Sequence, residues 1–215
     1  TEGAQDYDLI LRATEQTDKI QHIPHVLYHW RAVGGSTALA AQEKDYAHRK
    51  AVEVLNDAVA RRNLPAEVLE TGLGAYHRIR YNLPDPPPSV SVIIPTKDRV
   101  DLLSVCLKGL LEKTDYANFE ILIVDNNSTE AETFDYFGMI EKNEKVSVLK
   151  FPGEFNFSAI NNFAVSKANG EIIILLNNDI EVISEGWLRE LVSQAYRPGV
   201  GAVGCRLYYP DDHVQ

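Results

Sequence analysis

Three groups of polar residues in this chain have the types and the spacing of a ligand-binding site. Each group directly follows an apolar run: residues 95–99 (PTKDR), 125–128 (DNNS) and 177–179 (NND). Their carboxylates, amides and hydroxyls can hydrogen-bond a polar ligand. Open α/β sheets bind ligands beyond the carboxyl ends of their strands. If the apolar runs are neighbouring parallel strands, we therefore expect the three groups to line one concave polar site.

Each group also has a purely structural interpretation. Residues 125–128 are typical of a turn and a helix N-cap, residues 177–179 of a second turn, and Lys97 and Arg99 of solvated loop charges. Independent turns need not all fall on one edge of a sheet. Their occurrence together favours a site, although each group taken alone leaves both interpretations open.

The elements that would position these groups alternate along the second part of the chain. Apolar runs predict strands at residues 90–94, 119–124, 146–151, 171–176 and 200–209, and amphipathic stretches predict helices at residues 100–113, 129–141, 158–168 and 184–196. Runs as apolar as these are buried on both faces, as in a parallel sheet covered by helices. We therefore expect an α/β fold with a mostly parallel sheet and helices on both faces, left incomplete because the chain stops just after its last strand.

The first part of the chain predicts a smaller α+β segment. Its patterns predict helices at residues 6–15 and 40–62 and strands at residues 20–23, 26–30 and 75–83. Prolines at positions 84, 86, 87 and 88 then predict an extended, semi-rigid connector. The expected organisation is a first segment at 1–83, a linker at 84–89 and an α/β domain at 90–215.

The composition argues against several classes of protein. The chain has 215 residues, is 45% hydrophobic and 24% charged, and carries a net charge of −10. An acidic surface argues against nucleic acid as a partner, because phosphate backbones require stripes of Lys and Arg. No apolar run approaches the roughly 18 residues of a transmembrane helix, and no secretory leader opens the chain. The two cysteines lie in apolar settings without the spacing of metal ligands, which indicates a reducing compartment and no disulfide framework. We therefore expect a cytoplasmic protein.

The runs that carry the polar groups resemble a known family. VSVIIPTKDR, FEILIVDNNS and EIIILLNNDIEV, in this order and at this spacing, are similar to the family 2 glycosyltransferases of the GT-A (Rossmann-like) fold, closest to those that build bacterial surface polysaccharides, including rhamnosyltransferases. The resemblance covers residues 89–215. It implies an enzyme that transfers a sugar, with inversion, from a nucleotide-diphosphate donor (UDP- or dTDP-linked) to a glycan or lipid-linked glycan acceptor.

The resemblance implies a donor-binding role for residues at and near the strand ends. Thr96 and Asp125 are expected to contact the nucleotide base and ribose, and the segment FNFSAINN at 155–162 to line the donor pocket. An alternative for that segment is a helix start capped by Ser158. The full set expected to bind the nucleotide sugar is Pro95, Thr96, Arg99, Asp125, Asn127, Asn156, Asn161, Asn177 and Asn178.

Residues 177–179 stand where the family has its Asp-x-Asp motif. By the resemblance, Asp179 keeps the carboxylate that would bind Mg²⁺ or Mn²⁺, and the first position is Asn177 rather than Asp. An amide oxygen can serve a hard cation, with less charge and a lower expected affinity. In an acidic protein, the cation is expected to bridge the donor's diphosphate to the carboxylate.

The first segment resembles the late part of the same kind of domain. GAQDYDLILR and HIPHVLYHWR match the region of the acidic motif and the closing strands, with Asp6 at the position of the catalytic base and residues 29–31 where the family often contacts metal or diphosphate. Helix N-terminal carboxylates and a strand end are the alternatives. This order predicts the end of one module followed by the start of the next. A permuted site with Asp6 opposite Asp179 is a further possibility.

Other interpretations stay open at this point. A non-catalytic nucleotide-binding or scaffolding fragment would suit the weakened metal motif. An NAD(P) enzyme would need the glycines at 199–204 (GVGAVG) to open a helix, whereas they precede a predicted strand. The unfinished sheet leaves an exposed edge, through which two copies can pair as a homodimer. A longer parent protein or its acceptor would hold the chain at the inner face of the membrane.

Overall fold

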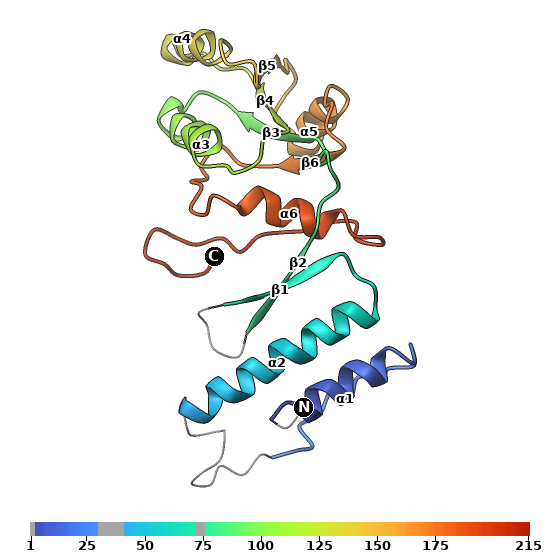
Figure 1. The fold of residues 1–215 in the computed structure, drawn as a ribbon. Coiled ribbons are helices and arrows are strands. Elements are labelled where there is room, and N and C mark those ends of the chain that lie inside the picture. Colours follow the sequence, from blue (N-terminus) through green and yellow to red (C-terminus); the bar gives the residue numbers. More distant parts are fainter. Residues whose placement is uncertain (1–2, 30–40, 72–75) are drawn as a thin grey trace. The chain divides into compact units, whose positions relative to one another are not determined.

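The computed structural model describes residues 3–29, 41–71 and 76–215. The chain divides into two compact units, Thr1–Asn82 and Leu83–Gln215, called unit 1 and unit 2 below. Each unit has its own helices, its own sheet and its own buried side chains (Figure 1).

Unit 1 consists of two helices and a two-stranded antiparallel sheet. Its elements are α1 (Gln5–Thr14), α2 (Ala41–Arg61), β1 (Ala66–Glu70) and β2 (His77–Tyr81). Val54, Leu55 and Ala58 are buried and recur at helical spacing on one face of α2. The guanidinium of Arg61 donates two hydrogen bonds of 2.9 Å to the carboxylate of Glu15, which ties the end of α2 to the end of α1.

Both predicted helices of unit 1 are confirmed, but its strands differ from the prediction. Residues 20–23 and 26–29, all within the described part of the chain, form no strand, and Trp30 lies outside the described residues. Ile20 and Val26 are 68% and 82% exposed. These apolar runs lack the neighbouring strand that a β-ladder requires. β2 falls within the predicted strand at 75–83, whereas β1, whose composition AEVLE favours a helix, is not predicted.

Unit 2 contains a four-stranded parallel sheet in the order β5-β4-β3-β6. Its strands are β3 (Val90–Thr96), β4 (Phe119–Asp125), β5 (Val146–Lys150) and β6 (Ile172–Leu175). In the parallel register, Val90 of β3 lies beside Phe119 of β4 and Ile172 of β6. The carboxyl ends of the strands therefore lie at one edge, and the predicted parallel sheet is confirmed.

Helices cover both faces of this sheet because its strands are apolar on both sides. The helices are α3 (Val100–Glu112), α4 (Ala131–Ile140), α5 (Phe157–Val165) and α6 (Trp187–Ala195). Val90, Val92 and Ile94 of β3 pack with side chains of α3, α4 and α6 in one buried cluster. Ile93, which points to the opposite face, packs with Ile160 of α5 in a second cluster. In Figure 1, α3 and α5 accordingly lie on opposite sides of the sheet.

The last predicted strand, at residues 200–209, is wrong. This described stretch forms no strand, and a single bridge joins Tyr208 to Val214. An apolar run becomes a strand only beside a partner, and β6 has no second neighbour in the described sheet. Glycines at 199, 201 and 204 weaken the strand preference further.

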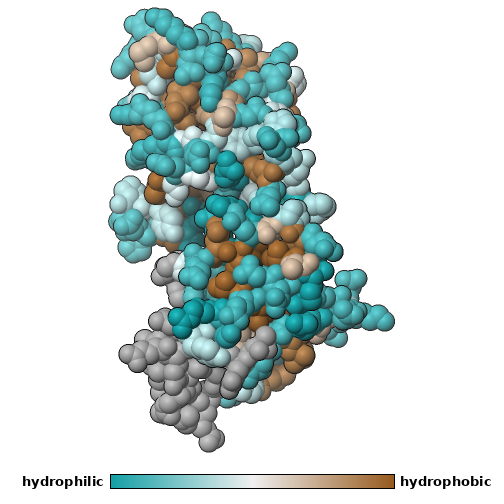
Figure 2. All heavy atoms as spheres, viewed as in Figure 1, coloured by the Kyte–Doolittle hydropathy of each residue, from teal (hydrophilic) through white to brown (hydrophobic). Residues whose placement is uncertain are grey.

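The surface carries exposed apolar side chains as well as hydrophilic ones. Figure 2 shows one face, on which apolar side chains form separate patches among hydrophilic ones. Leu9, Ile20 and Val26 of unit 1 and Phe155 and Ile183 of unit 2 are more than half exposed, so apolar surface occurs on both units. Among the described helices, none is both long enough and apolar enough to span a membrane.

Candidate functional site

The ends of β3 and β4 bring two of the predicted site residues together. Thr96 and Asp125 are the last residues of these strands and are Cα partners in the parallel register. Each is only 5% exposed. Pro95, one residue earlier, lies beside Val124. A hydroxyl and a carboxylate are therefore buried side by side at the predicted edge of the sheet.

Asn178 joins the third strand end to the other two. Its Nδ2 donates a hydrogen bond of 3.0 Å to Oγ1 of Thr96, across 82 positions of the sequence. The preceding Asn177 is exposed, and its carbonyl accepts a contact of 3.8 Å from Sγ of Cys106. Burial raises the pKa of the Cys106 thiol to about 11, so the thiol stays protonated and donates. Thr96, Asp125 and Asn178 thus meet at one place.

The turn after β4 is tied to the loop after β5 by two side-chain amides. Nδ2 of Asn126 donates to the carbonyls of Phe151 at 3.2 Å and Gly153 at 2.8 Å. Nδ2 of Asn127 donates to the same Gly153 carbonyl at 2.9 Å. Asn127 has a φ of 63°, a conformation that Asn tolerates better than most residues. The structural interpretation of this group as a turn therefore holds, and the turn also shapes the edge.

Asp98 lies in the loop after β3 and connects it to the turn after β4. Its backbone N–H donates a hydrogen bond of 2.8 Å to Oγ of Ser128, whose own N–H donates to Oδ1 of Asp125 at 2.9 Å. Oδ1 of Asp98 accepts the N–H groups of Thr129 at 2.8 Å and Glu130 at 3.0 Å. The bond from Glu130, followed by those from Thr129, holds the pKa of the Asp98 carboxyl below its usual value.

The two cationic side chains of the loop after β3 differ in their contacts. The guanidinium of Arg99 donates to both carboxylate oxygens of Asp101, at 2.9 and 2.7 Å, and is 60% exposed. Lys97 is exposed and makes no hydrogen bond or ion pair with any described residue. Arg99 is therefore neutralised by its neighbour, whereas the charge of Lys97 is available to an anionic ligand.

Asn156, directly before α5, and Asn161, within it, do not hydrogen-bond to the strand ends in the described part of the chain. Asn156 is the N-cap of α5, and its Oδ1 accepts a hydrogen bond of 3.0 Å from the N–H of Ala159, so the alternative that Ser158 is the cap is wrong. Asn161 is 4% exposed, and its Nδ2 donates to the carbonyl of Phe157 at 2.7 Å. Its Oδ1 is buried without a partner among the described residues. A buried acceptor without a donor is costly, so this oxygen lowers the stability of unit 2 in the described arrangement.

Oxygen donors for a divalent cation are present but sparse. Asp179 is exposed, and its carboxylate makes no hydrogen bond or ion pair with the residues that the structure describes. Asn177, two positions earlier, is also exposed. No group of three or more His, Cys, Asp or Glu side chains within the described ranges could hold a metal. Because Mg²⁺ is often bound by one or two carboxylates together with substrate phosphates, these residues fit a cation that binds with a diphosphate.

Asp6, the predicted catalytic base, lies in the first turn of α1 in unit 1. It is exposed, and its carboxylate has no partner among the described residues. The nearby Asp8 accepts a hydrogen bond of 2.8 Å from Nε of Arg12. Of the predicted residues 29–31, His29 is exposed and non-helical, and the other two lie outside the described residues. The role of Asp6 therefore stays a prediction.

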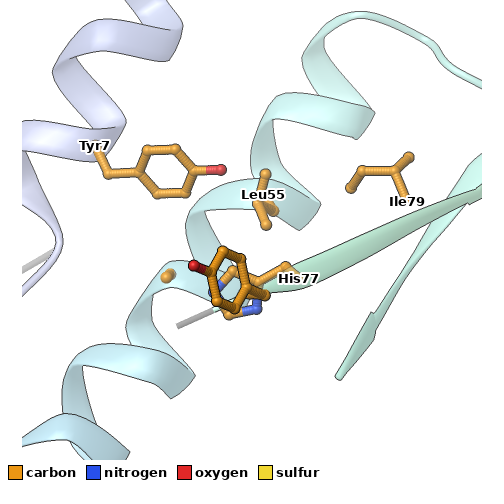
Figure 3. A pocket seen from close by; sticks show the side chains of 6 residues that line it. Tyr7, Leu55, His77 and Ile79 are labelled. Atoms are coloured by element: carbon orange, nitrogen blue, oxygen red, sulfur yellow. The ribbon is translucent and has the colours of Figure 1, made fainter. Parts of the chain in front are cut away.

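A pocket in unit 1 is not predicted by any sequence pattern. It has a volume of about 410 Å³ and is lined by Tyr7, Ala51, Leu55, Tyr76, His77 and Ile79. Figure 3 shows its side chains meeting from α1, α2 and β2. The ring of His77 stacks on that of His48, with centroids 4.5 Å apart. Burial, and then the neighbouring His48, lower the pKa of His77, so this wall is uncharged at neutral pH.

The sequence of unit 2 matches one protein family. The model described as "Glycosyl transferase family 2" matches residues 91–215. The chain is 44% identical to an uncharacterized protein, y4gI, of Sinorhizobium fredii and also 44% identical to the O-antigen biosynthesis protein RfbC of Myxococcus xanthus. Both matches cover 100% of this chain, which spans only 24% and 16% of these relatives.

The fold is also similar to that of a solved structure. A mannosyltransferase from Pyrobaculum calidifontis, in complex with GDP-Man and Mn²⁺, gives a TM-score of 0.52 at 24% sequence identity. The similarity covers 80% of this chain and 47% of the mannosyltransferase. At this identity it concerns the fold, which is the α/β arrangement described above.

Proposed function

This chain belongs to glycosyl transferase family 2, and we propose that unit 2 binds the nucleotide-sugar donor of an enzyme that extends a bacterial surface polysaccharide. The observation that carries the proposal is the meeting of Thr96, Asp125 and Asn178 at the carboxyl edge of a parallel sheet. Ligands of open α/β sheets bind at this edge. The relative named for O-antigen biosynthesis supports a polysaccharide as the product.

The buried carboxylate of Asp125 suits a hydroxyl of the nucleoside. One of its oxygens accepts the N–H of Ser128, and the other takes no hydrogen bond from the described residues. At 5% exposure, that oxygen would bind a hydroxyl with little competition from water. We therefore assign Asp125 and Thr96 to the nucleoside end of the donor. The other proposed donor-binding residues are Pro95, Arg99, Asn127, Asn156, Asn161, Asn177 and Asn178.

We assign the diphosphate end of the donor to Asp179. Its free carboxylate, with the amide oxygen of Asn177, would hold Mg²⁺ or Mn²⁺ together with the diphosphate oxygens. A bound cation would supply positive charge that stabilises the departing diphosphate. Lys97 adds an unpaired positive charge in the turn after β3. The Mn²⁺ bound with GDP-Man in the mannosyltransferase supports this choice of cofactor.

We further propose that the chain joins parts of two tandem modules. Residues 1–83 would close one module, residues 84–89 would link them and residues 90–215 would open the next. The relatives support this order, because they match the entire chain and are several times longer. Asp6 would be the base that takes the proton of the acceptor hydroxyl in an inverting displacement, since its carboxylate is exposed and unpaired among the described residues, unlike that of Asp8.

Calorimetric titration with UDP, dTDP and GDP, with and without Mn²⁺, tests the donor site. We expect one nucleotide to bind in a manganese-dependent manner. Asp179→Ala should weaken that binding by at least about tenfold, because it removes the carboxylate proposed to hold the cation. Glu185→Ala, which removes an exposed carboxylate six positions away, is the matched control and should leave affinity unchanged.

Two outcomes would contradict parts of this proposal. If none of the nucleotides binds, unit 2 has the fold of the family without a donor site, and a scaffolding role is favoured instead. If binding is unaffected by Mn²⁺ and by Asp179→Ala, the metal assignment is wrong while the nucleoside site stands.

A further inference from the structure

A line of hydrogen bonds runs along the carboxyl edge of the sheet in unit 2. It begins at Asn178, whose Nδ2 donates to Oγ1 of Thr96 at 3.0 Å. The same hydroxyl donates to the backbone carbonyl of Asp98 at 3.3 Å. The hydroxyl of Thr96 thus acts as acceptor and donor at once, and it connects the turn after β6 with the turn after β3.

The line continues from Asp98 to the turn after β4. The backbone N–H of Asp98 donates to Oγ of Ser128 at 2.8 Å, and the N–H of Ser128 donates to Oδ1 of Asp125 at 2.9 Å. Asp98 therefore contributes its carbonyl to one side of the line and its N–H to the other. Ser128 is 9% exposed and Asp125 5%, so water competes little for these bonds.

The side chain of Asp98 fixes the position of this backbone. Its Oδ1 accepts the N–H groups of Thr129 and Glu130, at 2.8 and 3.0 Å, directly before α4. The hydroxyl of Thr133 in α4 lies 3.4 Å from the same oxygen. A carboxylate that accepts backbone N–H groups makes stronger hydrogen bonds than a neutral acceptor does. Asp98 thereby anchors the loop after β3 to the N-terminal end of α4.

The backbone of this loop is held in an unfavourable conformation. Asp98 and Arg99 have φ values of 52° and 56°, in the left-handed region that non-glycine residues seldom adopt. A residue in this region persists only where its surroundings impose the conformation. The bonds of the Asp98 carboxylate impose it here.

We propose that Asp98 is a positioning residue of the donor site, which holds the ends of β3, β4 and β6 in one arrangement. The proposal rests on the donor site proposed above and adds a residue that does not itself have to contact the donor. Without the Asp98 carboxylate, the loop after β3 can relax from its left-handed conformation. The Asp98 backbone then no longer fixes the position of Thr96 relative to Asp125.

The first test needs no ligand. Ser128→Ala removes the hydroxyl that accepts the Asp98 N–H. It changes neither of the two side chains, Thr96 and Asn178, that form the hydrogen bond at the other end of the line. In NMR spectra of the chain, we expect the side-chain amide signal of Asn178 to shift and the N–H of Asp98 to exchange faster. Glu132→Ala is the control: it removes an exposed carboxylate from the first turn of α4 that has no partner among the described residues, and it should leave both signals in place.

The second test uses the nucleotide diphosphates and Mn²⁺. For the nucleotide that the unsubstituted chain binds, Asp98→Ala should weaken affinity by roughly fivefold or more, as expected for coupling within one site. Asp98→Asn should restore most of it, because the amide Oδ1 can still accept the N–H groups of Thr129 and Glu130. A residue that only stabilised the fold would lower the melting temperature of Asp98→Ala without changing the affinity of the folded protein.

The outcomes separate this proposal from the proposed function. An unchanged Asn178 signal in Ser128→Ala, or an unchanged affinity in folded Asp98→Ala, overturns the positioning role. If the unsubstituted chain binds no nucleotide, the proposed function fails, and the Asn178 signal still decides whether Asp98 holds the strand ends. If Asp98→Ala does not fold, Ser128→Ala carries the affinity test as well.

Discussion

At the scale of single residues, Asn126 illustrates how a buried amide organises the edge of a sheet. It is 4% exposed, and its Nδ2 donates to the carbonyls of Phe151 and Gly153. An asparagine Nδ2 has two donors, and here both are used. The amide therefore satisfies two loop carbonyls and holds the loop after β5 against the end of β4.

We predict that Asn126→Ala lowers the free energy of unfolding of unit 2 by about 1–3 kcal/mol, because the carbonyl of Phe151 loses its side-chain donor and that of Gly153 keeps only Asn127. Urea denaturation followed by tryptophan fluorescence in a Trp30→Phe background, where Trp187 is the remaining tryptophan, would measure the change. Asn162→Ala is the control, since Asn162 is exposed on α5 and its side chain has no described partner. Its effect should stay within about 0.5 kcal/mol. Equal effects of the two substitutions would contradict the role of Asn126.

At the scale of elements, Gly170 allows β6 to lie beside β3. Its N–H donates to Oγ of Ser91 at 2.8 Å. A Cβ at this position would lie 2.3 Å from the backbone nitrogen of Ser91 and 2.6 Å from the carbonyl carbon of Val90. Both atoms belong to the backbone of the central strand, so they cannot yield as a flexible side chain would. Only glycine fits between the end of α5 and the start of β6.

We predict opposite effects for two Gly→Ala substitutions in unit 2. Gly170→Ala should destabilise the unit by about 1–3 kcal/mol, because the added methyl group is forced against β3. Gly138→Ala should stabilise it by about 0.5–1 kcal/mol, because Gly138 lies within α4 with nothing within 4 Å of an added Cβ. Thermal unfolding of both variants tests the pair. Destabilisation by Gly138→Ala, or tolerance of Gly170→Ala, would contradict it.

Much of unit 2 can be predicted from its sequence, because the local signals agree there. β3 and β4 are apolar along their length, as strands buried on both faces are. The run at 200–209 is also rich in apolar residues, although glycines interrupt it, and it forms no strand. What separates these cases is a neighbouring strand, and no pattern within the run itself reveals one. β1 is the converse, since its helix-favouring residues become a strand by pairing with β2.

The site is predictable to a similar extent. The polar types and strand-end positions of Thr96, Asp125 and Asn178 predict that these residues meet. The role of Asp98 is not predictable, because its carboxylate accepts backbone N–H groups of Thr129 and Glu130, and no residue type or spacing marks such partners. Asn156 and Ser158 are both good N-caps by residue type, so only the structure distinguishes them. The assignments of these residues to donor, metal and base remain predictions.

At the scale of the molecule, the two units differ in the groups that respond to pH. In unit 1, burial and the stacked ring of His48 lower the pKa of His77. The facing groups at this pocket include Tyr7 and Tyr76, and Glu70 favours the protonated ring only weakly, as the last of the causes. In unit 2, the Asp98 and Asp101 carboxyls have lowered pKa values, so their contribution to stability is lost only in acid.

We predict that unit 1 loses stability before unit 2 as the pH falls from 7.5 to 5.5. The folded form holds His77 neutral, whereas the unfolded chain protonates it near its ordinary pKa of about 6.5. The unfolded state therefore binds more protons below that pH, and stability falls with pH. Hydrogen exchange resolved by peptide, corrected for intrinsic rates, would measure this. His77→Phe should reduce the loss of stability in unit 1. An equal loss of stability in both units would contradict the role of His77.

During synthesis on the ribosome, β3 can pair with β6 only after the later strand has been added to the chain. The hydrogen bond from Asn178 to Thr96 spans 82 positions. At synthesis rates of about 5–20 residues per second, Asn178 is added roughly 4 to 16 s after Thr96. During that interval the apolar strand β3 has one side without its partner, and an unpaired strand edge invites association with other chains. The unpaired edge of β3 is therefore open to association until β6 has been synthesised and the sheet can be completed.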